Sequence, residues 1–142
     1  MKSAGLILLV FVISAFAQEN VVPLFNGENL DGWVNVNCAP ETWTVKDGLI
    51  HCTGVPTGVM RTERMYENYI LELEYRHLTQ EGNSGLFVHS DPLPVTGKPF
   101  TRSIEIQILT DRNTENYTSH GDVFAIQGAT MAPFPPHPNG WM

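Results

Sequence analysis

Residues 103–109 have the sequence Ser-Ile-Glu-Ile-Gln-Ile-Leu and carry the polar side chains best suited to chemistry in this chain. Side chains alternate between the two faces of an extended strand, so Glu105 and Gln107 share one face and three isoleucines share the other. We expect the isoleucine face to be buried in a β-sandwich core. The opposite face would then display a carboxylate and an amide to a polar ligand such as a sugar; an ordinary solvated strand face is the alternative.

Glu105 is the best candidate for a general base or a ligand-binding carboxylate. A glutamate between isoleucines is partly shielded from water, which raises its pKa unless a cation pairs with it. Its structural alternative is a solvated residue or an ion-pair partner for Arg76. Gln107 can both donate and accept hydrogen bonds, as recognition of a sugar hydroxyl requires.

Several other polar residues are candidates for ligand contact, and each has a structural alternative. Together with Glu105, the imidazoles of His89 and His120 are of donor types that bind divalent transition metals, but the spacing of the three residues is non-local and does not establish a site. Arg76 follows Glu72 and Glu74 on one strand face, so a structural ion pair is as good an interpretation as substrate contact. A tight turn is expected at 83–85. The further candidates are Arg76, Asn83, His89, His120 and Asp122.

The beginning of the chain resembles a secretory signal. Lys2 precedes an apolar run over 6–13, and Ala-Phe-Ala at 15–17 is a cleavage pattern, so the expected mature domain is 18–142. Neither this run nor any later one is long enough to span a bilayer, so we expect an exported chain, secreted or periplasmic, with no membrane association after cleavage. Outside the reducing cytosol, Cys38 and Cys52 can form a disulfide or stay free.

The charge excludes one class of partner. The formal net charge is −7, and loss of Lys2 with the signal makes it −8. An acidic chain without a basic stripe repels phosphate backbones, so nucleic acid is not an expected partner.

The remaining sequence indicates an all-β domain. Asp47-Gly48 between two short apolar runs is a strong hairpin signal. Alternation of apolar and charged residues predicts a strand over 69–76, and further strands are expected at 86–89 and 123–126. No stretch of the mature chain has convincing helical periodicity, and short strands separated by turn residues are typical of a sandwich or barrel.

The number of acidic groups on the Glu105 strand restricts the reaction. Ordinary glycoside hydrolysis needs two carboxyl groups flanking the scissile bond. Sandwich glucanases that resemble laminarinases carry them as Glu-x-Asp-x-Glu along one strand, whereas this chain has Glu105, Gln107 and Leu109 at those places. One base with polar helpers is better suited to proton abstraction next to a carbonyl.

Seven motifs, in order along the mature chain, resemble the 3-keto-disaccharide hydrolase domain family. They lie at 24–33, 43–48, 58–62, 69–76, 82–87, 104–109 and 120–124. The resemblance implies a concanavalin-like jelly roll that binds sugars whose 3-hydroxyl is oxidised to a ketone, as 3-keto di- or oligosaccharides. For such a substrate we expect Glu105 to be the base that removes the proton at C2 and forms an enolate, or a metal ligand if a divalent ion binds. Gln107, His120 and Asp122 are expected to contact sugar hydroxyls or the enolate.

The end of the chain is proline-rich and cannot supply a closing strand. Family domains continue into a Gly-Glu-Trp-Asn-like motif and final strands, so we expect this chain to be a fragment.

Two other functions stay open. One is a non-catalytic carbohydrate-binding module, with Trp33, Trp43 or Trp141 stacking on sugar rings. The other is a purely structural cell-surface domain.

Overall fold

A computed structural model describes residues 21–78, 82–109, 118–130 and 141. This part of the chain contains six strands and no helix, which confirms the all-β prediction. The strands are β1 (Trp33–Asn35), β2 (Trp43–Lys46), β3 (Leu49–Cys52), β4 (Met60–Thr62), β5 (Asn83–Val88) and β6 (Ile104–Leu109). The expected signal segment lies outside the described residues, and so does most of the proline-rich end. The jelly-roll order of strands stays a prediction.

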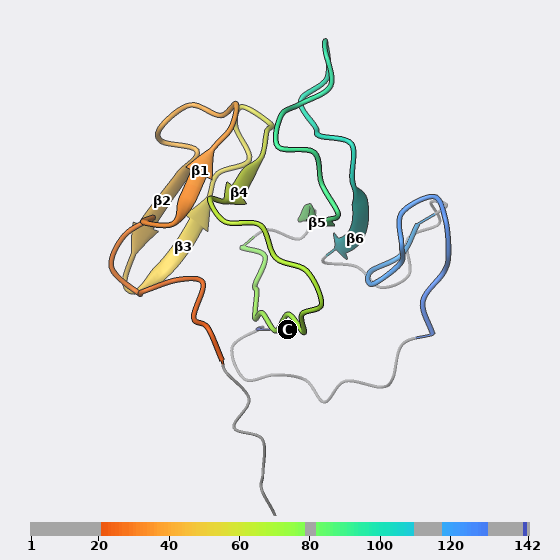
Figure 1. The fold of residues 1–142 in the computed structure, drawn as a ribbon, viewed down its shortest axis with the longest axis horizontal. Coiled ribbons are helices and arrows are strands. Elements are labelled where there is room, and N and C mark those ends of the chain that lie inside the picture. The colour runs from red at the N-terminus through yellow and green to blue at the C-terminus, as the bar shows by residue number, and fades with distance from the viewer. Residues whose placement is uncertain (1–20, 79–81, 110–117, 131–140, 142) are drawn as a thin grey trace, which may run out of the picture.

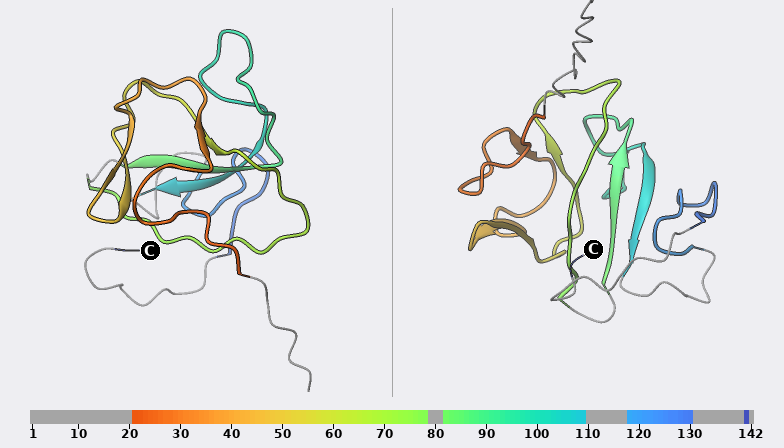
Figure 2. Two further views of the ribbon diagram at one scale, coloured as in Figure 1. Left: turned by 60° about the vertical axis from the view of Figure 1, so that its left-hand side comes forward. Right: turned by 90° about the horizontal axis from the view of Figure 1, so that it is seen from below.

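The strands form three antiparallel ribbons, β1 with β4, β2 with β3, and β5 with β6. The first two ribbons lie together on one side of the molecule and β5–β6 lies on the other (Figures 1 and 2). No helix among the described residues is long and apolar enough to cross a bilayer.

The β2–β3 hairpin confirms the Asp-Gly prediction. Asp47 and Gly48 both have positive φ values, 52° and 73°. Two consecutive residues in that region make the tight turn whose twist matches the flanking strands, and glycine adopts it without the steric cost of a side chain.

The predicted strand at 69–76 is absent. Amphipathic alternation predicts how a strand divides its faces, but a strand also needs a neighbouring backbone, and no described residue supplies a ladder there. Part of the expected apolar face is open, since Tyr69 is 43% and Leu73 is 46% exposed. The segment is held instead by side-chain contacts of Tyr75 and His77.

Two other local predictions were wrong. Asn83, Ser84 and Gly85 are not a turn but the first half of β5. The segment at 123–126 is not a strand, because Ala125 has a positive φ of 57° that bends the chain, and Val123 makes only isolated bridges to Ile106 and Gln127.

The β5–β6 ribbon continues as a long connecting arm, residues 91–102, which rises beyond the strands (Figure 1). The Asp91 N–H donates to the Arg102 carbonyl at 2.8 Å, and Pro94 and Thr101 form an antiparallel bridge. The arm therefore continues the pairing of its two parent strands.

Candidate functional site

Glu105 lies near the start of β6, directly opposite Phe87 of β5. Side chains of cross-strand partners point to the same face, so one face of this ribbon carries Asn83, Gly85, Phe87, Glu105, Gln107 and Leu109. We call these six residues the Glu105 face. Three of the sequence candidates, Glu105, Gln107 and Asn83, are therefore brought together by the register of β5 and β6.

Gly85 makes room for the catalytic candidate. A Cβ atom at this position would overlap the Glu105 side chain, including its Oε1 oxygen. The carboxylate thus lies across the strand over the Gly85 backbone, and any larger residue would push it away. A glycine inside a strand often marks such a close approach, and this was the available sequence signal for Gly85.

The Glu105 side chain is half-buried, and this burial raises the pKa of its carboxyl above the ordinary value. No described cation forms an ion pair with it, since the ion pair found within the described residues joins Arg102 and Asp91. A carboxylate that is shielded but not neutralised by a cation has the basicity that proton abstraction needs.

Gln107 is buried and not open to solvent, with a side chain that is 2% exposed. Its Nε2 donates to Asn83 Oδ1 at 2.8 Å and to the Ser84 carbonyl at 3.4 Å. Its Oε1 has no hydrogen-bond partner among the described residues. The face predicted to be open is therefore partly covered, whereas Ile104 on the predicted core face is 38% exposed. In this geometry Gln107 positions Asn83 and β5.

His120 and Asp122 lie along the other edge of β6. The Gln107 N–H donates to the Asp122 carbonyl at 2.9 Å, and Gly121 N donates to the Gln107 carbonyl at 2.8 Å. His120 Nδ1 accepts from the Leu109 N–H at 3.1 Å, and the Tyr75 hydroxyl lies 2.8 Å from its Nε2. Both residues thus complete the backbone pairing of β6.

The Asp122 carboxylate is engaged by backbone donors. Its Oδ1 accepts from Ala129 N at 2.8 Å, and its Oδ2 accepts from Ser119 N at 2.7 Å. These two hydrogen bonds, that of Ala129 first, lower the pKa of Asp122. The structure therefore gives this carboxylate a role in shaping its own loop.

Among the described residues, neither of the other sequence candidates, His89 and Arg76, forms an ion pair with Glu105. His89 is exposed beyond the end of β5 with a φ of 51°. The Arg76 guanidinium lies over the Trp141 ring, 5.0 Å from its centroid. No three His, Cys, Asp or Glu side chains among the described residues come together as a metal site, so Glu105, His89 and His120 do not form one.

The cysteines and the other two tryptophans are not part of the Glu105 face either. Cys38 and Cys52 are free thiols in the structure, and burial raises the pKa of Cys52. Trp33 donates from Nε1 to the Leu24 carbonyl at 2.7 Å. The Trp43 indole nitrogen is buried, and it has no hydrogen-bond partner in the described part of the chain.

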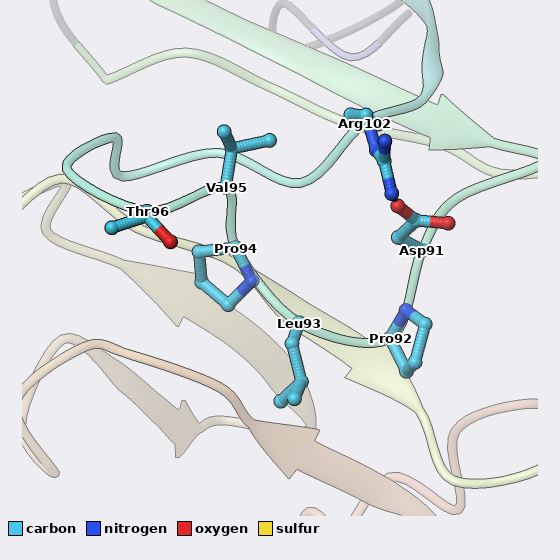
Figure 3. A pocket seen from close by; sticks show the side chains of 7 residues that line it. All are labelled: Asp91, Pro92, Leu93, Pro94, Val95, Thr96 and Arg102. Carbon is cyan, nitrogen blue, oxygen red and sulfur yellow. The ribbon is translucent and has the colours of Figure 1, made fainter.

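A surface hollow of about 500 Å³ lies on the connecting arm (Figure 3). It is lined by Asp91, Pro92, Leu93, Pro94, Val95, Thr96 and Arg102. Neither Glu105 nor any β5 residue lines it. Its carboxylate, Asp91, forms an ion pair with Arg102 at 2.7 Å, so we place the candidate site on the Glu105 face.

Together these features define, over the residues that the structure describes, an all-β domain with one shielded carboxylate, Glu105, on a strand face. Residues 20–141 match the family model described as a 3-keto-alpha-glucoside-1,2-lyase-like domain, so the chain belongs to that family. This confirms the resemblance seen in the sequence motifs and supports a carbohydrate substrate and a hydrolase-like, glycoside-related function. Searches of curated proteins and of solved structures gave no match.

Proposed function

We propose that this protein is an enzyme that cleaves 3-keto-disaccharides or other 3-keto-glycosides, with Glu105 as the base that removes the proton from C2. The half-buried Glu105 carboxylate over Gly85, with its raised pKa, is the observation that carries the proposal. Membership of a family described by a 1,2-lyase-like activity on 3-keto-alpha-glucosides agrees with it.

The chemistry explains why one carboxylate is enough. A ketone at C3 acidifies the hydrogen on C2, so the Glu105 carboxylate accepts that proton and the electron pair forms an enolate. The enolate then expels the C1 oxygen substituent, which takes up a proton and leaves as the second sugar. Water adds across the resulting C1–C2 double bond and gives net hydrolysis.

The scale of the effect follows from general acid–base catalysis. A positioned base contributes about 10²–10⁴-fold to the rate, and stabilising the enolate oxygen contributes more. Elimination avoids most of the oxocarbenium character that makes paired acids necessary in ordinary glycosidases.

As part of the proposal, the substrate is an oxidised di- or oligosaccharide met after export, in the periplasm or outside the cell.

The test compares wild type with Glu105→Gln on a 3-keto-disaccharide and on the unmodified disaccharide, each with and without chelator. We expect wild type to release two sugars from the 3-keto substrate only, and Glu105→Gln to lose at least 10²-fold in kcat/KM. Glu72→Gln makes the same change at an exposed carboxylate and is the matched control. Full activity in Glu105→Gln would refute the base assignment.

Deuterium at C2 tests the proposed step directly. We expect a primary isotope effect on kcat/KM, or exchange of the C2 label with solvent, in wild type. A sugar-binding module would instead bind the 3-keto-disaccharide and leave it intact, which would establish the non-catalytic alternative.

A further inference from the structure

Phe100 of the connecting arm presents an exposed aromatic ring beside the Glu105 face. Phe87 is the direct cross-strand partner of Glu105. The rings of Phe87 and Phe100 meet edge to face, with centroids 6.0 Å apart and planes at 86°. The Phe100 side chain nevertheless stays 45% exposed. An apolar ring is therefore kept partly open at the border of the candidate site.

The base of the arm is fixed by polar contacts. Arg102 Nε and Asp91 Oδ2 form an ion pair at 2.7 Å, and Figure 3 shows the two side chains directed at each other. Further along the arm, Val95 N donates to the Phe100 carbonyl at 3.0 Å. These contacts restrict where the Phe100 backbone can move.

The arm is also attached to the neighbouring part of the molecule. Asn37 Nδ2 donates to the Pro99 carbonyl at 2.8 Å, and Arg61 Nε donates to the Pro92 carbonyl at 3.2 Å. Asn37 follows β1 and Arg61 is in β4, so the β1–β4 ribbon supports both sides of the arm. Phe100 is thus held by two separate regions and is preorganised for contact with a ligand.

We propose that Phe100 binds the second sugar ring of the substrate, the ring that leaves from C1. This assignment rests on the proposed function. Glu105 must stand beside C2 of the keto ring, and the oxygen that carries the leaving sugar is on the neighbouring carbon, C1. Glu105 and Phe87 are cross-strand partners, whose Cα atoms are about 5 Å apart. The Phe100 ring lies next to the Phe87 ring, in edge-to-face contact. The apolar face of a leaving sugar packs there against an aromatic surface.

The test compares two substrates, a 3-keto-disaccharide and methyl 3-keto-glucoside, which share the keto ring but differ in the leaving group. For Phe100→Ala we expect kcat/KM to fall at least tenfold on the disaccharide and less than twofold on the methyl glycoside. Phe100→Tyr keeps an aromatic ring and should restore the wild-type ratio. Leu93→Ala removes an exposed apolar side chain from the same arm and should leave the ratio unchanged.

A binding measurement separates this inference from the proposed reaction. Calorimetry with the 3-keto-disaccharide is performed on Glu105→Gln and on Glu105→Gln/Phe100→Ala, where turnover does not interfere. We expect at least tenfold weaker binding in the double variant. If wild type cleaves neither substrate but this loss is seen, the proposed reaction fails, the assignment to a leaving ring is overturned with it, and Phe100 is left as a contact for the bound disaccharide. Equal binding by both variants, or an unchanged substrate ratio in Phe100→Ala, overturns the assignment.

Discussion

The carboxylates of Glu105, in β6, and Asp122, beside β6, have opposite electrostatic environments. Glu105 is half-buried over Gly85, and burial raises its pKa. Asp122 accepts hydrogen bonds from two backbone N–H groups, which lower its pKa. The first group is more easily protonated than an ordinary glutamate, and the second is more firmly ionised than an ordinary aspartate.

This difference favours a role in the reaction for Glu105 and a structural role for Asp122. A base must accept a proton during turnover, and Glu105 has the environment that favours the protonated form. The two backbone N–H groups make stronger hydrogen bonds to a charged Asp122 carboxylate than to a neutral one. Its environment therefore keeps Asp122 ionised. Position in the sequence, where both are polar residues near strands, does not distinguish them.

The largest expected effect comes from Gly85→Ala, which tests the space that Glu105 occupies. The new Cβ would overlap the carboxylate, so the base must move off its position. We expect kcat/KM on a 3-keto-disaccharide to fall about 10²-fold, because misplacement by about 1 Å costs that much. Ser84→Ala, on the opposite face of β5, is the control. Wild-type activity in folded Gly85→Ala would show that the carboxylate does not need this site.

The next effect is on stability, through Gln107→Glu. This change puts a carboxylate at a position that is 2% exposed and removes the donor to Asn83 Oδ1. We expect a loss of about 3 kcal/mol in the free energy of unfolding at pH 7, as for an uncompensated buried charge. The loss should shrink at acidic pH, where the new group is protonated, and urea denaturation at two pH values measures both. Gln107→Leu removes the amide without adding charge and should lose less.

A smaller effect concerns the pH dependence of activity. Glu105 acts only when ionised, so kcat/KM should fall as the pH decreases through its raised pKa, by about tenfold per pH unit below it. The acid limb should therefore lie above the ordinary glutamate range. The sign for stability is opposite, because ionising a shielded carboxyl disfavours folding, and Glu105→Gln should gain stability over wild type as the pH rises. An acid limb at or below the ordinary glutamate value would contradict the shielding.

Local sequence patterns predicted the parts of this fold that depend on local chemistry. Asp47-Gly48 specifies its turn through positive φ values, and alternation at 104–109 specifies which side chains share a face. The strand expected at 69–76 fails because pairing depends on a distant partner that periodicity does not reveal.

The same limit applies to the candidate site. Glu105 was found from its neighbours in sequence, whereas Gly85 and Phe87 matter only through the register of β5 against β6. Phe100 reaches the border of the site because its ring packs edge to face on the Phe87 ring. Asp122 was expected to contact the ligand; its oxygens accept from the backbone of Ser119 and Ala129, and local sequence does not indicate the Ala129 contact, which is seven residues away.

The smallest effect on turnover should come from Asp122→Asn, which tests the architectural side of the comparison. One amide NH₂ group would face a backbone N–H that now donates to a carboxylate oxygen. Because the pKa of Asp122 is lowered in the fold, its contribution to stability is present above the ordinary aspartate pKa and is lost as the pH falls through the lowered value. We therefore expect a lower Tm at pH 7, a difference that vanishes in strong acid, and a kcat/KM per folded molecule within about twofold of wild type. Asp31→Asn, at an exposed carboxylate, is the control. A large fall in kcat/KM with an unchanged Tm would show that Asp122 takes part in the reaction, and the contrast with Glu105 would no longer hold.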